Sequence, residues 1–240
     1  MISDKAVIET SDIGSNVIFS EFCVVRNNVK IGNNVVIHPN VIIYESVEIG
    51  DDVEIFPGSF IGKKPKATNA LSRDTNYKQI VKIGKGSSIG VNATIYYDVK
   101  IGDNTLIGDG AIIREQSVIG NSCVIGQLTS LNYNVEIGNN SKLMAYTRIS
   151  GNCKIGNNVF IGVGVIAPND NNIANRQYSA SETKSAMIED NVSIGSGAII
   201  LPNLKIGNGS LIGAGAVVTN DVEENSQVMG MPARHIKYTK

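Results

Sequence analysis

Two carboxylates and two amides recur at a nearly constant spacing in the middle of the chain. Asp98, Glu115, Asn134 and Asn152 follow one another at intervals of about 18 residues. A carboxylate can orient an attacking amine or hydroxyl or accept its proton, and an amide can hold reacting groups by hydrogen bonds. These four side chains can share one site only if the chain returns to the same corner about every 18 residues.

A six-residue repeat provides that return. An aliphatic residue begins each unit, and a small or β-branched residue usually takes the fifth place; units begin between Val7 and Ile61, between Ile83 and Ile161, and between Ile188 and Val218. Three units per turn predict short parallel strands joined by tight corners, which is a β-solenoid. The first and fifth residues should point inward. The three cysteines, Cys23, Cys123 and Cys153, all hold the fifth place and are expected to be buried thiols.

Every third unit belongs to the same face of this solenoid. One face has ten unit starts, from Ile13 to Ile206, and nine of them are followed by Gly. Ten starts predict about ten coils. On another face, Gly is almost absent from the second place of the units. The corner that follows this face should stack polar and aromatic side chains from successive coils. The corner residues expected there are Tyr96, Tyr97, Asp98, Arg114, Glu115, Gln116, Asn132, Tyr133, Asn134, Ser150, Gly151, Asn152, Asn169 and Asp170.

Two insertions, at about 63–82 and 170–187, interrupt the repeat at this same polar corner, and the phase is restored after each. Loops longer than about 12 residues are usually either functional or disordered. Their coincidence with the polar column indicates one binding cleft, although solvent-exposed corners are polar in any case. We therefore expect one β-helical domain over 1–223, with both loops, followed by a C-terminal tail over 224–240.

Composition excludes several classes of protein. The chain has 240 residues, 42% of them hydrophobic, and a formal net charge of -1, so no electrostatic footprint for nucleic acid or an anionic membrane is present. Its start lacks the features of a signal peptide, and no apolar run approaches the roughly 20 residues that span a bilayer. A cytoplasmic location is expected. The two histidines cannot supply a three-histidine metal site, and no metal is expected.

Several stretches resemble the left-handed β-helix, or hexapeptide-repeat, acyltransferases. The ending "VMGMPARHIK" is similar to the Gly-x-Pro-Ala-Arg ending of members that use acetyl-CoA. The stretch "VFIGVGVIAPNDN" is similar to the Asn-Asp element of nucleotide-sugar N-acetyltransferases. The stretches "SFIGKKPKATNALSRDTNY" and "LMAYTRISGNC" resemble elements of the UDP-N-acetylglucosamine O-acyltransferases of lipid A synthesis.

The resemblance implies a left-handed coil, a homotrimer with active sites between subunits, and acetyl-CoA or another acyl-CoA as co-substrate. The donor would lie along the C-terminal coils. Small residues there would admit its pantetheine arm, and a basic residue would meet its phosphates. The donor-binding residues carried over in this way are Ser196, Gly197, Ala214, Gly215 and Arg234.

The catalytic histidines of the family have no counterpart here. The aligned positions hold Arg148 and Gly151, while the chain's two histidines, His38 and His235, lie elsewhere in the repeat and in the tail. A hydroxyl needs a strong base before it attacks a thioester, whereas an amine titrates far closer to neutrality. The absence of histidine therefore favours N-acylation over O-acylation.

The expected acceptor is a nucleotide-linked amino-deoxysugar, carried by dTDP or UDP, from surface polysaccharide or glycan precursor synthesis. Asp98, Glu115 and Asn152 are the candidate catalytic residues, although Arg114 and Glu115 could instead form a purely structural ion pair. The candidate acceptor-binding residues are Lys64, Arg73, Tyr77, Tyr97, Arg114, Tyr133, Asn134, Asn169 and Asp170. The alternatives are an O-acyltransferase for a sugar or other small hydroxyl acceptor, and a structural β-solenoid without catalysis.

Overall fold

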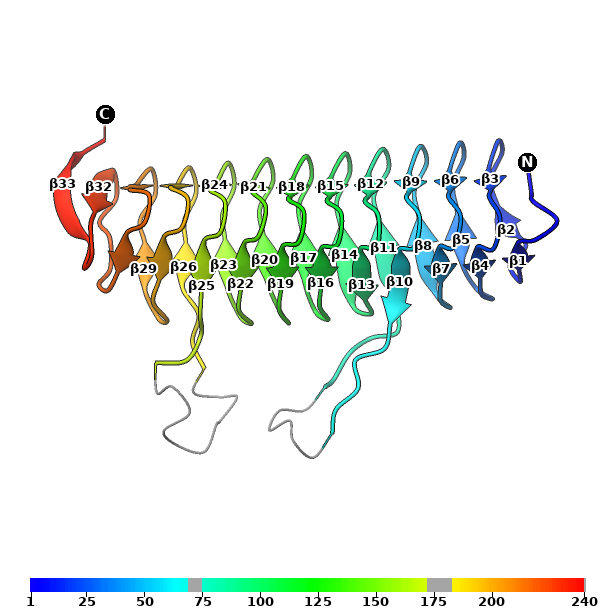
Figure 1. Cartoon of the computed structure of the whole chain (residues 1–240), viewed down its shortest axis with the longest axis horizontal. Helices are drawn as coiled ribbons and strands as arrows, with labels where there is room; N and C mark the ends of the chain where they lie inside the picture. Colours follow the sequence, from blue (N-terminus) through cyan, green and yellow to red (C-terminus); the bar gives the residue numbers. More distant parts are fainter. Residues whose placement is uncertain (69–74, 172–182, 240) are drawn as a thin grey trace.

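Short strands stack into three parallel sheets that form the sides of an elongated prism (Figure 1). The computed structural model describes residues 1–68, 75–171 and 183–239. Within these ranges the regular structure is all β-strand, and no helix is long and apolar enough to cross a membrane. The predicted fold, an all-β left-handed parallel β-helix with two loop insertions, is confirmed.

Each side of the prism is one sheet, and consecutive strands of a sheet come from consecutive coils. Sheet 1 has 11 strands: β1 (Val7–Ile8), β4 (Val24–Val25), β7 (Ile42–Ile43), β10 (Phe60–Lys63), β13 (Thr94–Tyr96), β16 (Ile112–Ile113), β19 (Ser130–Leu131), β22 (Arg148–Ile149), β25 (Ile166–Ala167), β28 (Ile199–Ile200) and β31 (Val217–Val218). Sheet 2 has 10 strands: β2 (Asp12–Ile13), β5 (Lys30–Ile31), β8 (Val47–Ile49), β11 (Val81–Ile83), β14 (Val99–Ile101), β17 (Val118–Ile119), β20 (Glu136–Ile137), β23 (Lys154–Ile155), β26 (Met187–Ile188) and β29 (Lys205–Ile206). Sheet 3 has 12 strands: β3 (Ile18–Phe19), β6 (Val36–Ile37), β9 (Glu54–Ile55), β12 (Ser88–Ile89), β15 (Leu106–Ile107), β18 (Val124–Ile125), β21 (Lys142–Leu143), β24 (Phe160–Ile161), β27 (Ser193–Ile194), β30 (Leu211–Ile212), β32 (Ser226–Met229) and β33 (Arg234–Tyr238).

The register follows the repeat. Ile101 of β14 pairs with Ile119 of β17, and the ten strands of sheet 2 correspond to the ten coil starts counted from the sequence. The last strand breaks the pattern because β33 folds back antiparallel on β32. The residues expected to form a tail thus contribute β32 and β33 to sheet 3.

The core lies inside the prism and is built from the first and fifth residues of each unit. Ile101, Ile107 and Ile113, one from each side, are at most 3% exposed. Full burial of such a side chain contributes about 1.5–3 kcal/mol relative to an exposed one. The three cysteines are buried and unpaired, as predicted, and burial raises the pKa of the Cys153 thiol to about 12.

Three rows of corners join the sheets. Corner 1 follows the strands of sheet 1, corner 2 follows sheet 2, and corner 3 follows sheet 3. The last residue of a corner usually has a positive φ, which Gly, Asn and Asp adopt most readily. Asn, Asp and Gly at these places therefore let each coil turn tightly enough to stack on the next.

Candidate active site at corner 1

Both loops leave the prism from corner 1. The first lies between β10 and β11 and the second between β25 and β26, and Figure 1 shows them projecting from the same side. The turns after β13, β16, β19 and β22 occupy the stretch of corner between the loops. The prediction that the insertions share one corner with the polar column is therefore confirmed.

The end of the first loop packs on Tyr97. The Tyr77 ring stacks on the Tyr97 ring, with centroids 6.1 Å apart and planes 9° from parallel. Gln79 Nε2 donates to Tyr97 Oη at 3.4 Å, and Tyr97 Oη donates to the Glu45 carbonyl oxygen at 3.0 Å. Burial raises the pKa of Tyr97 to about 12, so its hydroxyl stays protonated at neutral pH. Tyr97 anchors the loop from beneath it.

The next coil holds a buried ion pair. Arg114 Nε donates to Glu115 Oε2 at 3.1 Å, and Arg114 Nη2 donates to Glu115 Oε1 at 3.0 Å. The Glu115 side chain is fully buried, while 26% of the Arg114 side chain is exposed. The guanidinium also lies 5.5 Å from the Tyr96 ring centroid, and Lys63 Nζ lies 5.0 Å from it. Both cations are thereby held at the edge of the first loop.

Asp98 is the less restricted of the two candidate carboxylates. It is half-buried at the last place of its corner, with φ 60°, and its backbone N–H donates to the Ile80 carbonyl at 2.7 Å. Among the described residues, none forms a hydrogen bond or ion pair with its carboxylate. Asp98 can therefore accept a hydrogen bond from a ligand without first losing one.

The same column continues through Gln116, Asn134 and Asn152, whose φ values are 65°, 53° and 67°. Asn134 Nδ2 donates to Asn152 Oδ1 at 2.8 Å, which fixes the orientation of both amides. Gln116 Nε2 donates to the Asn76 carbonyl at 2.8 Å and so ties the first loop to the column. These amides lie in the line expected from the sequence.

Tyr133 fills the space beside Gly151. A Cβ atom built on Gly151 would lie 2.5 Å from Tyr133 Cζ, closer than two carbon atoms can approach. Gly151 is one of the two positions that align with family histidines, and the other, Arg148, lies on β22 with an exposed side chain. The arrangement leaves no room for an imidazole at position 151. Sequence reasoning missed this contact, although a large ring and a Gly at the same place in successive coils are its signal.

The second loop contributes its first residues to the site. Asn169 Nδ2 donates to the Gly151 carbonyl at 3.3 Å, and Asn171 Nδ2 donates to the Pro202 carbonyl at 3.4 Å. Asp170 is half-buried beside them. In the first loop, Lys64 is exposed, and Arg73 lies outside the described residues. The described ends of both loops thus border the column.

The residues expected to bind the donor form a separate surface. Gly197 and Gly215 belong to corner 3 and have open space where a Cβ would stand. Ser196 and Ala214 precede them and are exposed, while Arg234 is exposed on β33. Because sheet 1 runs from corner 3 to corner 1, its outer face separates this surface from the column in one chain.

The chain's histidines lie away from corner 1, and the described residues form no metal site. Within 1–68, 75–171 and 183–239 no three His, Cys, Asp or Glu side chains are grouped to hold a metal ion. His38 pairs with Glu54, with His38 Nε2 2.7 Å from Glu54 Oε1, and stacks on Phe56 in an early coil. His235 lies on β33. Corner 1 therefore offers a carboxylate, amides and cations, without imidazole.

Comparison with known proteins places these features in a family. The profile of the bacterial transferase hexapeptide family (six repeats) matches 28–63, 80–115, 98–133, 134–166 and 185–220, about two thirds of the chain. A galactoside O-acetyltransferase from Lactococcus lactis is 40% identical over 57 residues, 24% of this chain and 28% of that protein. A 2,3,4,5-tetrahydropyridine-2,6-dicarboxylate N-acetyltransferase from Staphylococcus carnosus is 55% identical over 53 residues, 22% of each chain.

The match to these curated relatives spans only about a quarter of their length. Among solved structures, a UDP-N-acetylglucosamine acyltransferase from Bacteroides fragilis covers 99% of this chain and 74% of its own, with a TM-score of 0.53 and 22% identity. That similarity concerns the fold. The repeat, its stacking into three sheets and the profile match agree, and the chain belongs to the bacterial transferase hexapeptide family.

Proposed function

We propose that the protein is an acyl-CoA-dependent N-acyltransferase, and specifically an N-acetyltransferase, for the amino group of a dTDP- or UDP-linked amino-deoxysugar. The observation that carries the proposal is the stretch of corner 1 between the two loops. It presents the Asp98 carboxylate, which has no partner among the described residues, together with oriented amides and loop-edge cations, and the chain's histidines lie elsewhere. Membership of a transferase family supports acyl transfer as the reaction class.

The proposed reaction needs orientation more than a strong base. The neutral amine attacks the thioester carbonyl and forms the new C–N bond, the C–S bond breaks, and CoA leaves as a thiolate. The ammonium proton passes through the Asp98 carboxylate to the departing sulfur, so the products are an amide and CoA thiol. Asn152 holds the sugar or the carbonyl through its amide, which Asn134 orients at 2.8 Å.

Glu115 has a different part in this proposal. It is fully buried, so it acts through Arg114, whose exposed edge can meet a phosphate of the nucleotide. Lys64, Arg73 and Tyr77 of the first loop are proposed to bind the diphosphate and the base or ribose. Asn169 and Asp170 are proposed to border the sugar from the second loop. Tyr97 and Tyr133 support these groups from within the corner.

The position of the donor surface supports a trimer with shared sites. Ser196, Gly197, Ala214 and Gly215 on corner 3 lie across sheet 1 from the column. A second copy that presents its corner 3 to corner 1 would bring an acyl-CoA to the acceptor. The homotrimer expected from the resemblance would make that contact three times.

The test is a panel of acceptors with acetyl-CoA as donor and free thiol as readout. UDP- and dTDP-linked 3-amino and 4-amino sugars form one arm, and the matched sugars with hydroxyl groups form the other. Turnover only in the amino arm is expected. Lys64→Ala should raise KM for the nucleotide sugar and leave KM for acetyl-CoA unchanged. Turnover confined to the hydroxyl arm would overturn N-acylation and favour O-acylation, the activity named for the Lactococcus relative.

A further inference from the structure

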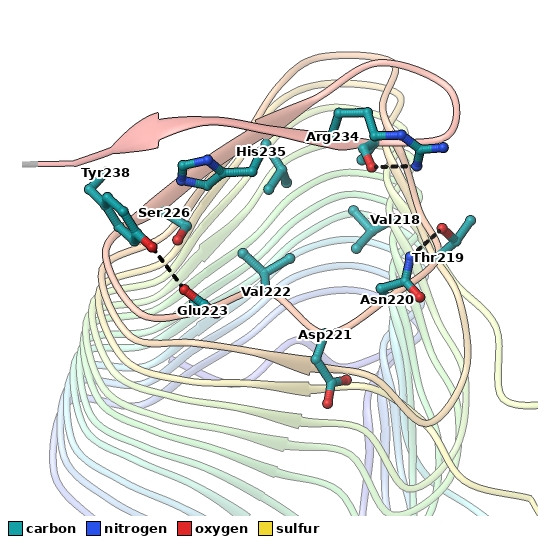
Figure 2. A pocket seen from close by; sticks show the side chains of 12 residues that line it. Val218, Thr219, Asn220, Asp221, Val222, Glu223, Ser226, Arg234, His235 and Tyr238 are labelled. Carbon is teal, nitrogen blue, oxygen red and sulfur yellow. Dashed lines mark hydrogen bonds between the residues drawn. The ribbon is translucent and has the colours of Figure 1, made fainter.

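A cavity of about 390 Å³ lies at the C-terminal end of the prism, beyond the stretch of corner 1 between the two loops. Figure 2 shows it between the last coil and β33, with Val218, Val222 and Ser226 on one side and His235 and Arg234 on the other. Its volume is in the range of small-molecule sites. The stretch of corner between the two loops contributes none of the lining residues.

The floor of the cavity is the open end of the hydrophobic core. Val218 ends sheet 1, Val222 bridges to Ile206 of sheet 2, and Val228 belongs to β32 of sheet 3. These three side chains are 1%, 5% and 8% exposed. In every earlier coil such residues are covered by the next coil. Here β33 crosses the end, and the space that another coil would fill remains open.

Ser226 continues a ladder of inward hydroxyl and thiol groups. In the earlier coils each such group donates to a backbone carbonyl of the following coil: Ser87 Oγ to Gly102 at 2.9 Å, Thr105 Oγ1 to Gly120 at 2.9 Å, Cys123 Sγ to Gly138 at 3.1 Å, Ser141 Oγ to Gly156 at 2.8 Å and Ser210 Oγ to Glu223 at 2.8 Å. Ser226 stands one coil beyond Ser210, because Leu211 pairs with Gln227.

At Ser226 the ladder has no following coil. The residue is 1% exposed, it lines the cavity, and its Oγ has no hydrogen-bond partner within the described chain. A buried hydroxyl without a partner costs about 1–3 kcal/mol, so such groups in native proteins normally find an acceptor. The missing acceptor is a carbonyl oxygen at the place of the next coil, inside the cavity.

The charged side chains around the cavity are of both signs. Arg234 lines it with one cation, and Asp221 and Glu223 line it with two carboxylates. Tyr238 Oη donates to Glu223 Oε2 at 3.0 Å, and the backbone N–H of Lys205 donates to Asp221 Oδ1 at 2.8 Å. Both carboxylates are therefore already engaged. Neither a strongly anionic nor a strongly cationic ligand is selected by this rim.

We propose that the cavity at the C-terminal end binds a small neutral aliphatic carbonyl compound, such as a branched amide. Its carbonyl oxygen accepts from Ser226 Oγ, and its aliphatic body packs on Val218, Val222 and Val228. The ligand reproduces what a further coil would supply, a peptide carbonyl and an aliphatic side chain. This site is independent of the proposed acyl transfer at corner 1.

The probe is 3-methylbutanamide, titrated into the full-length protein and followed by ligand-observed NMR. Binding to the wild type with a Kd of the order of 1 mM is expected for so small a molecule. Ser226→Ala should weaken binding about 5- to 10-fold, the equivalent of one net hydrogen bond. Val222→Phe, which fills the cavity, should abolish binding. Absence of wild-type binding up to about 50 mM, or equal binding by Ser226→Ala, would overturn the proposal.

Ser210→Ala is the matched control. It removes the same group one coil earlier, where the hydroxyl already has partners at the Gly207 and Glu223 carbonyls. Ser210→Ala should lower Tm by about 2–4 °C and leave the probe's Kd unchanged. Ser226→Ala should leave Tm unchanged or raise it, because it removes an unsatisfied group. A fall in Tm for Ser226→Ala equal to that for Ser210→Ala would show that the hydroxyl already has a partner.

Competition with CoA separates this site from the proposed donor site. The probe's Kd should be the same with and without saturating CoA. Displacement of the probe by CoA would show that the cavity, through Arg234, belongs to the donor site, and would overturn the claim of a separate one. Failure of the acceptor panel at corner 1 would not affect the result.

Discussion

Corners 1 and 2 belong to the same coils, but corner 2 repeats the same contact in successive coils and corner 1 does not. At corner 2 the side-chain oxygens of Asp103, Asn121, Asn139 and Asn157 each accept from a backbone N–H of the preceding coil at 2.8–3.0 Å. The Gly before each leaves room for the neighbouring backbone. At corner 1 between the loops the contacts differ from coil to coil: Glu115 pairs with Arg114, and the Tyr133 ring lies against Gly151.

The difference between the two corners shows why some positions of the repeat keep the same residue type in every coil. A residue that contacts the equivalent residue of the next coil is constrained to the same type in every coil. A residue whose partner is a loop, a neighbouring Arg or a ligand is released from that constraint. Irregularity within a solenoid therefore indicates where a residue contacts something other than its equivalent in the next coil.

Loss of Arg114 should give the largest effect. Arg114→Ala leaves the Glu115 carboxylate buried without its bidentate partner, and the free energy of unfolding should fall by about 3 kcal/mol. Lys154→Ala is the control, because Lys154 and Glu136 form an exposed pair on sheet 2 and its loss should change stability by less than about 1 kcal/mol. Urea unfolding of both variants measures the contrast. Equal losses would mean that the corner 1 pair is no more than a surface pair.

The same substitution at Asp98 and at Asp103 tests whether an aspartate serves the reaction or only the fold. Asp98→Asn should lower kcat about 100-fold or more, which corresponds to about 2.7 kcal/mol, with little change in Tm. Asp103→Asn should leave kcat and Tm nearly unchanged, because an amide oxygen replaces Asp103 Oδ1 as the acceptor for Lys85, as Asn121 does in the next coil. Steady-state kinetics with the best acceptor of the panel measures the difference. An unchanged kcat for Asp98→Asn would remove Asp98 from the mechanism.

The glycines of the two corners should differ in the same way. At Gly102 a Cβ would lie 2.6 Å from the Gly120 carbonyl carbon, a backbone atom that cannot move aside, so Gly102→Ala should cost about 2–3 kcal/mol. At Gly151 the three nearest atoms belong to the Tyr133 ring, a side chain that can shift, and Gly151→Ala should cost about 1–2 kcal/mol.

A double variant tests the assignment of that obstacle. With Tyr133→Ala in place, the further cost of Gly151→Ala should be smaller than in the wild type, since the ring has been removed. Gly102→Ala should keep its full cost in the same background. Strict additivity of Tyr133→Ala and Gly151→Ala in urea unfolding would contradict the contact.

The smallest effect concerns Tyr97 and pH. Burial raises the pKa of Tyr97 in the folded protein from its ordinary value of 10.0 to about 12, so its contribution to stability is present below pH 10 and is lost as pH rises from about 10 to about 12. Tyr97→Phe should lower the free energy of unfolding by about 1 kcal/mol at pH 8. The difference should shrink at higher pH, because the wild type loses stability as Tyr97 ionises and the Phe variant does not. Urea midpoints at pH 8, 10 and 11 follow this trend. Tyr146→Phe, at an exposed place on corner 3, is the control and should leave the free energy of unfolding unchanged at each pH.

Much of the architecture was predictable because each coil is the template for the next. The spacing of Ile13, Ile31 and Ile49 specifies one face, and the interruptions after Ile61 and Ala167 place both loops on one corner. The inward place of Cys123 also follows from the period. Such features depend on sequence separation alone, since in-register stacking converts a period into a position.

The details of the candidate site were less accessible. Glu115 and Asp98 look equivalent as carboxylates in the sequence, yet Glu115 is fully buried and ion-paired while Asp98 keeps an open carboxylate. The direction of a corner side chain depends on its neighbours, in this case Arg114 and the first loop. Gly151 likewise appeared to leave a space, which the Tyr133 ring fills.

The sequence by itself determined the fold class, the three faces and the corner that carries the loops, because six-residue units at three per turn bring every third unit onto the same face of a common core. Only the tertiary structure decided which polar groups are free. The Ser226 hydroxyl has the same place in its unit as Ser210, but it lies at the end of the prism, where the described residues offer it no acceptor. Satisfaction of a polar group depends on what lies across from it in space.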